Sequence, residues 1–303
     1  MARAMRSLGW IAAATLAWVA VSLAPGYAQQ AAPVDADVYG QLCWRFIGPS
    51  GNRVSAVAGV PDDQFVYYAG AASGGIFKTT DAGLNWTPIF DDQPVASIGD
   101  IAVAPSDPNI VWVGTGESCI RSHISVGEGI FKSVDAGKTW TRMGLEQTGR
   151  IGRVVVHPTN PEVVLACALG HAYGPQPERG VFRTTDGGAS WEHVLFVDEH
   201  TGCSALAMDP ANPRKLFAGM WQIDIKTWGR ESGGPGSGLF VSQDGGTTWQ
   251  RQQGHGLPTR EVGKVKVAIA RSNPNRVYAL IETGDGVPLR GEETDRGQVW
   301  RSE

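Results

Sequence analysis

The stretch that decides the fold is GVFRTTDGGASW, residues 180–191. Its pattern recurs as GIFKTTDAGLNW at residues 75–86, GIFKSVDAGKTW at 129–140 and GLFVSQDGGTTW at 238–249. The copies follow one another roughly every 50 to 60 residues, a spacing typical of solenoid and propeller repeats. The chain is therefore an array of one repeated unit.

Each copy predicts a short strand, a tight turn and a second strand that opens with a tryptophan. The carboxylate of Asp186 can accept hydrogen bonds from the N–H groups that follow it, and Gly188 can take the positive φ that closes the turn. Trp191 can bury ~150–250 Å², so we expect it to pack between neighbouring units. The turn aspartates are Asp81, Asp135, Asp186 and Asp244, and the tryptophans are Trp86, Trp140, Trp191 and Trp249. We assign all eight a structural role.

A second repeated element supplies the other two strands of each unit. Examples are APSDPNIVWVGT from Ala104 and HPTNPEVVLACA from His157, in which an Asp-Pro or Asn-Pro turn precedes a β-branched or aromatic run. A further apolar strand stands before each turn. Four antiparallel strands per unit, without the helical period, predict an all-β propeller. The chain holds about five units, the last incomplete, and we expect it to be part of a larger ring.

The motif S/T-x-D-x-G-x-T/S-W resembles the Asp box of bacterial neuraminidase (BNR) repeats. The resemblance implies a β-propeller of four-stranded antiparallel blades with Asp-box turns. Families with this motif include sialidases, xyloglucan-active glycosidases, sortilin-type receptors and photosystem assembly factors. Because one fold serves such different activities, the resemblance implies the architecture and leaves the function to the site residues.

The amino-terminal end is typical of a targeting segment. Arg3 and Arg6 precede an uncharged apolar run at residues 8–24, and small residues before Gln29 predict cleavage near Ala28. We interpret residues 1–28 as a signal peptide of a secreted or periplasmic protein, with an uncleaved membrane anchor as the alternative.

The remaining chain divides into a linker at residues 29–43 and the propeller at residues 44–303. The segment around Trp44 resembles the strand that follows each Asp box, without the three strands that should precede it. It is a candidate outer strand for the incomplete last unit.

The four cysteines, Cys43, Cys119, Cys167 and Cys203, allow three disulfide pairings in an oxidising compartment. Isolated thiols are the alternative, and the sequence favours no pair. No Cys or His spacing is typical of a metal site, so we predict neither a metal nor a cofactor. The net charge of −4 disfavours nucleic acid and, beyond export, a membrane surface as partners.

The variable connections of the units predict where a ligand binds. In a four-stranded blade they emerge on the side opposite the Asp boxes, here at residues 115–129, 168–180, 220–238 and 281–297. We expect a peptide, protein or carbohydrate ligand there, with Trp228 and Arg230 as leading anchors. The candidate ligand-binding residues are Trp221, Trp228, Arg230, His171, Tyr173, Arg121 and His123. The alternative is that Trp221 and Trp228 only roof the loops.

Charged residues near the starts of the inner strands could surround the mouth of the central channel. They are Asp100, Arg150, Arg153 and Lys264. A mutual salt-bridge network is the favoured interpretation of these four.

A catalytic role needs two carboxylates ~5–9.5 Å apart. In xyloglucan-active relatives one of them precedes the Gly-Gly of the first blade, where this chain has Ala72 and Ser73. Glu117 and Glu231 are isolated candidates. The favoured hypothesis is therefore an exported, sortilin-like binding propeller without catalysis. The alternative is a glycoside hydrolase with catalytic carboxylates partly outside this chain.

Overall fold

The computed structural model describes residues 40, 48–49, 53–121, 124–283 and 299–302. The predicted signal peptide, Trp44 and Cys43 lie outside the described residues. Among the described residues there is no helix long and apolar enough to span a membrane.

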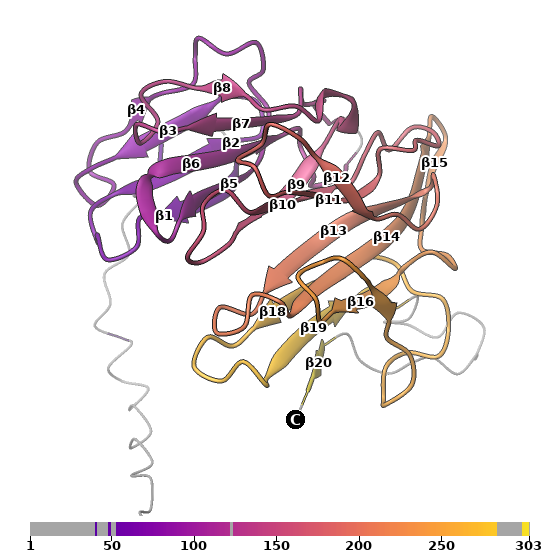
Figure 1. The fold of residues 1–303 in the computed structure, drawn as a ribbon. Coiled ribbons are helices and arrows are strands. Elements are labelled where there is room, and N and C mark those ends of the chain that lie inside the picture. The colour runs from indigo at the N-terminus through magenta and orange to yellow at the C-terminus, as the bar shows by residue number, and fades with distance from the viewer. Residues whose placement is uncertain (1–39, 41–47, 50–52, 122–123, 284–298, 303) are drawn as a thin grey trace, which may run out of the picture. The chain divides into compact units, whose positions relative to one another are not determined.

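The strands form five consecutive antiparallel sheets, here called blades 1 to 5 (Figure 1). Blade 1 contains β1 (Val54–Gly59), β2 (Tyr67–Ala71), β3 (Ile76–Thr79) and β4 (Thr87–Pro88). Blade 2 contains β5 (Ile98–Ala104), β6 (Asp107–Thr115), β7 (Ile130–Ser133) and β8 (Thr141–Arg142). Blade 3 contains β9 (Ile151–Val156), β10 (Val164–Ala168), β11 (Gly180–Thr184) and β12 (Glu192–Leu195). Blade 4 contains β13 (Thr201–Met208), β14 (Leu216–Lys226), β15 (Gly229–Ser232), β16 (Gly238–Ser242) and β17 (Gln250–Arg251), and blade 5 contains β18 (Val265–Ile269), β19 (Val277–Ile281) and β20 (Val299–Arg301).

These sheets confirm the predicted all-β class and four-stranded units. Each of the first four blades has the expected strand order, and the helical part of the described chain is a single 3-10 turn, Glu146–Thr148. Blade 5 has three strands among the described residues. The first strand of each blade is the inner strand, and the inner strands of successive blades pack side by side.

The prediction of a single loop over residues 220–238 is wrong. Strand β14 continues to Lys226 and pairs with β15, so that Ile223 lies opposite Ser232 and Lys226 opposite Gly229. The extension forms because Ile223 and Ile225 are buried on one face, which gives this part of β14 the alternation of a half-buried strand.

The Asp-box turn is closed by a fixed set of hydrogen bonds, shown here for blade 3. Thr184 Oγ1 donates to Asp186 Oδ1 (2.6 Å), and Ser190 N donates to the same oxygen (3.0 Å). Gly188, at φ 96°, donates its N–H to Thr184 Oγ1 (2.9 Å). Asp81, Asp135 and Asp244 accept equivalent bonds in their own turns.

These hydrogen bonds make the stability of the fold depend on acid pH. Backbone and side-chain donors at Asn85 and Thr79 lower the pKa of Asp81 to about 2, and equivalent donors lower the pKa of the other three aspartates. A carboxylate whose pKa is lower when folded contributes stability above its unfolded pKa, near 4, and loses it as the pH falls. We expect the Tm to drop between pH 5 and pH 2.

The Asp186→Asn variant should melt earlier than wild type at pH 7 and show a shallower decline in Tm below pH 4. Thermal unfolding followed by circular dichroism at several pH values measures both effects. The exposed Asp92→Asn variant is the control and should follow wild type. Equal pH slopes for Asp186→Asn and wild type would contradict the assignment.

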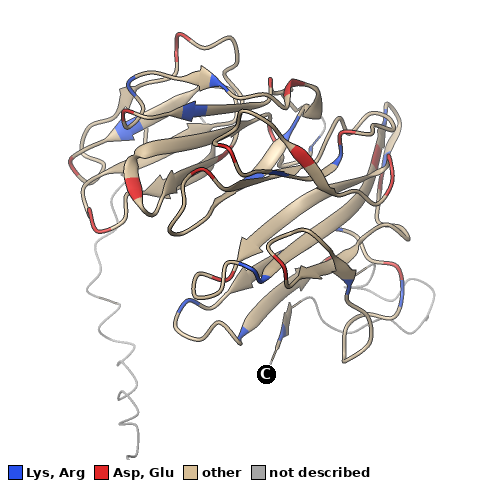
Figure 2. Ribbon diagram, viewed as in Figure 1, with Lys and Arg blue, Asp and Glu red and all other residues tan. Residues whose placement is uncertain are grey.

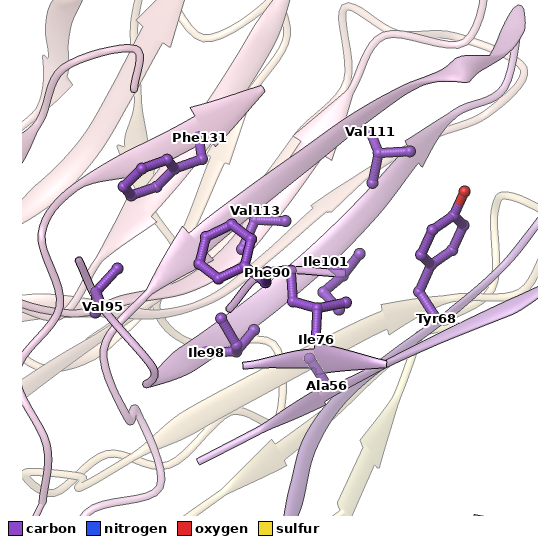
Figure 3. Packing of buried hydrophobic residues seen from close by; sticks show 10 residues of the cluster. All are labelled: Ala56, Tyr68, Ile76, Phe90, Val95, Ile98, Ile101, Val111, Val113 and Phe131. Atoms are coloured by element: carbon purple, nitrogen blue, oxygen red, sulfur yellow. The ribbon is translucent and has the colours of Figure 1, made fainter. Parts of the chain in front are cut away.

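The Asp-box tryptophans of blades 2, 3 and 4 each pack against the preceding blade. Trp140 donates from Nε1 to Ile89 O (2.8 Å) and meets Phe90 edge-on at 5.2 Å. Trp191 donates to Met143 O (2.7 Å), and Trp249 packs in the cluster that contains Leu165. Figure 3 shows how buried side chains of blades 1 and 2, such as Ile76, Phe90 and Phe131, gather into one cluster between the sheets.

A second contact recurs between the second strand of one blade and the inner strand of the next. An added Cβ at Gly70 would lie 2.5 Å from Ile98 Cγ2, and one at Gly114 would lie 2.5 Å from Ile151 Cγ2. The same position between blades 4 and 5 pairs Gly219 with Val265. Between blades 3 and 4 the pair is a disulfide, Cys167–Cys203. The sequence left the pairing open, and the described residues also include a free thiol at Cys119.

The inner strands of the first four blades also share a β-bulge next to this contact. The residues at the bulge are Ser55, Gly99, Gly152 and Ser204. Ser55 Oγ donates to Ile98 O (2.6 Å) and Ser204 Oγ to Val265 O (2.7 Å), so each serine ties its blade to the next. At Gly99 the backbone itself comes close, since an added Cβ would lie 2.1 Å from Ile151 O.

Candidate functional site

The long connections of blades 2, 3 and 4 pack together into one apolar layer, here called the loop roof. Ile120 and Ile124 from blade 2 contact buried side chains of blades 3 and 4. The buried members are Leu169, Ala172, Trp221, Ile223 and Ile225. Ile225 N also donates to Ala172 O (2.8 Å), which joins the β14 extension to the loop of blade 3. The variable loops are thus held as one surface.

Two fully buried arginines, Arg150 and Arg179, hold the loops of the roof together through hydrogen bonds to their main chain. Arg150 donates to Gly170 O (3.3 Å) and Ile124 O (3.3 Å). Arg179 donates to His200 O, to Ile223 O and to the main chain of its own loop. Because planar guanidinium groups offer several donors in fixed directions, one side chain can hold carbonyls from different loops. Both arginines therefore support the surface and are not exposed on it.

Glu117 lies at the inner edge of the roof, and its carboxylate forms ion pairs with two arginines. Its side chain is 1% exposed and accepts bonds from Arg53 (2.8 Å) and Arg121 (2.9 Å). Burial alone would raise the pKa of Glu117, but the hydrogen bonds and charges of Arg121 and Arg53 lower it below its ordinary value. The carboxylate stays ionised and is a poor proton donor. Through Arg53 this loop of blade 2 is joined to blade 1.

The β14–β15 hairpin carries the most exposed aromatic side chain of the roof. Trp228 sits at the turn and is 84% exposed, and Arg230 follows on β15 as an exposed residue. Glu231 is exposed as well and pairs with Lys226 (3.1 Å). The hairpin extends from the end of β14 in Figure 1. Trp228 and Arg230 thus lie close together on one short element.

The other predicted ligand-binding residues fall into different environments. Trp221 is 3% exposed and donates to Ser232 Oγ (2.9 Å), so its ring lies in the roof, as the alternative interpretation of this residue expected. Its strand continues further than the sequence suggested, and this places the ring in the roof. Tyr173 is 53% exposed. His171 is partly buried, and its pKa is lowered by burial and by the charges of Arg150 and Arg179, which favour the neutral imidazole. His123 lies outside the described residues.

The predicted network at the inner strands forms in part. Arg153 pairs with Asp100 (3.6 Å), whose Oδ2 also accepts Val154 N (2.7 Å). Burial raises the pKa of Asp100 despite the opposing charge of Arg153. Lys264 instead lies over the Trp221 ring at 4.8 Å.

Sequence reasoning missed Lys266, an exposed residue of β18 whose pKa falls to about 8 through desolvation by the surrounding protein and the nearby charge of Lys264. The signal was the Lys-x-Lys spacing at the start of an inner strand, which brings two cationic side chains near each other.

The carboxylate that the resemblance to xyloglucan-active relatives required in the first blade has no counterpart at that position. Ala72 is buried at the position where the resemblance required a carboxylate, and Ser73 follows it. Within the described part of the chain, no group of three His, Cys, Asp or Glu side chains is arranged to hold a metal ion. The surface combines the exposed rings of Trp228 and Tyr173 with the exposed guanidinium of Arg230, which suits the recognition of a polar ligand.

Comparisons with known proteins agree with this architecture. The sortilin-Vps10 family model (sortilin, neurotensin receptor 3) matches residues 128–256. A xyloglucanase from a Paenibacillus species is 24% identical over 66% of this chain and 21% of its own length. Xyloglucanase Xgh74A from Acetivibrio thermocellus is 24% identical over 84% of this chain and 31% of its own length. This chain therefore spans between about a fifth and a third of these relatives.

Solved structures show the same fold. An ancestral GH74 enzyme superposes with a TM-score of 0.59 at 21% identity, covering 78% of this chain and 28% of the enzyme. The GH74 xyloglucanase from Xanthomonas campestris gives a TM-score of 0.54 at 19% identity, covering 84% of this chain and 37% of the enzyme. Together with the family match, these structures confirm the resemblance to Asp-box β-propellers.

Proposed function

We propose that this Asp-box β-propeller is an exported binding protein that holds a glycan, peptide or protein ligand on the loop roof. The observation that carries the proposal is the packing of the loops of blades 2, 3 and 4 into one apolar layer fastened by Arg150 and Arg179. A prebuilt surface loses little entropy on binding, which favours affinity. The Asp-box side repeats nearly the same turn in each of the first four blades and offers less to distinguish one ligand from another.

Trp228 and Arg230 are the anchors of the proposed site. An exposed indole and a guanidinium two residues apart can stack on and hydrogen-bond the same group, and binding energy tends to concentrate in such residues. Export is part of the proposal and rests on the amino-terminal pattern at residues 1–28.

The test is a binding screen of the purified chain against arrays of glycans and secreted peptides, followed by calorimetry with any ligand found. Trp228→Ala and Arg230→Gln should each weaken binding at least tenfold, about 1.4 kcal/mol. The control is Leu84→Ala, which removes a 66% exposed side chain from the Asp-box turn of blade 1. If Leu84→Ala loses binding while both roof variants keep it, the ligand binds on the other side.

A second function, glycoside hydrolysis, is favoured by the relatives named xyloglucanases. Two observations argue against hydrolysis. Ala72 and Ser73 stand where a catalytic carboxylate is required, and the Glu117 carboxylate is held in ion pairs with Arg53 and Arg121. The decisive measurement is release of reducing ends from xyloglucan by the full-length protein. Turnover abolished by the loss of one acidic residue would replace the binding proposal with this one.

A further inference from the structure

The inner part of the loop-roof side holds a cluster of cations, here called the axial cluster and made of Arg153, Lys264, Lys266 and Arg230. Lys266 is an exposed residue of β18, and Lys264 directly precedes this strand, so two lysines stand two residues apart at the start of an inner strand. Inner strands start on the loop-roof side, which places both amines next to the roof. Lys266 Nζ donates to Ser204 O (2.5 Å), the bulge residue of the neighbouring inner strand.

Electrostatic effects within the cluster agree with this placement. The pKa of Lys266 is lowered mainly by burial and next by the charge of Lys264, with a smaller contribution from Arg153. The pKa of Lys264 is lowered mainly by burial; the charge of Glu282 opposes this, and the charge of Arg230 adds a smaller lowering. Like charges that lower one another's pKa are close in space.

Nearby carboxylates balance only part of this positive charge. Asp100 pairs with Arg153 (3.6 Å), and Glu282 accepts Lys264 N (2.9 Å) and Ser232 Oγ (2.7 Å). The amine of Lys266 has Ser204 as its one hydrogen-bond partner among the described residues. Charges of both signs are mixed over the sheets (Figure 2), and the chain as a whole has a net charge of −4. A local positive excess on an acidic protein attracts an anion to this place.

We propose that the axial cluster binds the carboxylates of an acidic glycan, one built from uronic acid residues. The inference rests on the proposed binding function and names the class of ligand. Guanidinium and ammonium groups form short, charge-assisted bonds with carboxylates. Trp228, exposed two residues from Arg230, offers an aromatic plane for the apolar face of a sugar ring. A neutral glycan would leave the excess positive charge of the cluster unbalanced.

The experiment compares oligogalacturonate with the same oligosaccharide after complete methyl esterification, by calorimetry with the whole chain. We expect the acid to bind at least tenfold tighter than the ester at ~50 mM salt, and the difference to shrink at ~300 mM. Lys266→Gln should weaken binding of the acid about tenfold, whereas Lys266→Arg should retain it. Lys138→Gln, an exposed lysine on an Asp-box turn, is the matched control and should behave as wild type.

The possible outcomes separate this inference from the proposed function. Equal affinity for the acid and its ester, or no binding of the acid, overturns the acidic-glycan assignment. If another ligand depends on Trp228 but is unaffected by Lys266→Gln, the binding function stands and the axial cluster has no part in it. Binding of poly-glutamate as tightly as oligogalacturonate would show that the partner is an acidic peptide, and would also overturn the assignment. Melting curves of the Lys266 variants must match wild type.

Discussion

The Gly99→Ala variant is expected to lose about 3 kcal/mol of folding free energy or more, the upper end of the cost of overpacking. An alanine Cβ at this position would lie 2.1 Å from Ile151 O and 2.6 Å from Gly116 O. Both neighbours are backbone atoms of packed strands and loops, so neither can rotate away as a side chain would. The methyl group therefore has to push the inner strands of blades 2 and 3 apart.

Urea unfolding followed by tryptophan fluorescence measures this loss. Gly174→Ala is the matched control, because nothing lies within 4 Å of its added Cβ. It should stay within about 0.5 kcal/mol of wild type, as surface substitutions usually do. If both variants were equally stable, the contact between the inner strands would be looser than the structure shows.

Breaking the Cys167–Cys203 disulfide is expected to cost about 2–4 kcal/mol, the typical contribution of such a bond. The two cysteines are buried, are 36 residues apart in the sequence and belong to different blades. The bond restricts the unfolded chain and adds a covalent link between two units that otherwise meet through packing and hydrogen bonds. Cys167→Ala/Cys203→Ala should therefore have a lower urea midpoint than the oxidised protein, by an amount that addition of a reductant to wild type reproduces.

A second pair of substitutions tests whether the disulfide replaces an apolar contact. The equivalent contacts are Gly70 with Ile98 and Gly114 with Ile151. The variant Cys167→Gly/Cys203→Ile should therefore recover about 1–2 kcal/mol relative to the double alanine variant, because it refills the space between the blades. The urea midpoint of this variant should not change when a reductant is added. Equal stability of the two double variants would mean that the contact between blades 3 and 4 is not equivalent to those between the other blades.

The repeated turns made the architecture predictable from the sequence. Asp186 and its counterparts indicate the Asp-box turn through hydrogen bonds to residues close in the sequence. The Asp-Pro or Asn-Pro turns indicate the first two strands of each unit in the same way, so both signals are short-range. The disulfide was not predictable in the same way. Cys167 and Cys203 become neighbours only when two blades are placed side by side. From the sequence alone, Cys119 was an equally good partner for either.

The site was less predictable, because its residues depend on how the loops pack. The sequence places Trp221 in a variable connection and left open whether it binds a ligand or roofs the loops, and the continuation of β14 buries it. Lys266 was overlooked because a lysine in an alternating strand is typical of a solvated face. Trp228 kept its predicted exposure because it occupies a hairpin turn, where a side chain has few neighbours.

The loop roof changes how the blades depend on one another. In a simple repeat array each unit contacts only its neighbours, and its parts can open one at a time. Here Ile120 and Ile124 of blade 2 pack against the cluster that contains Ile223 of blade 4, and Glu117 is bonded to Arg53 at the start of blade 1. Blades that share no sheet-to-sheet contact are thus coupled through the surface proposed to bind the ligand. Opening of any one of these blades disturbs that surface, so a bound ligand resists the local unfolding of all of them.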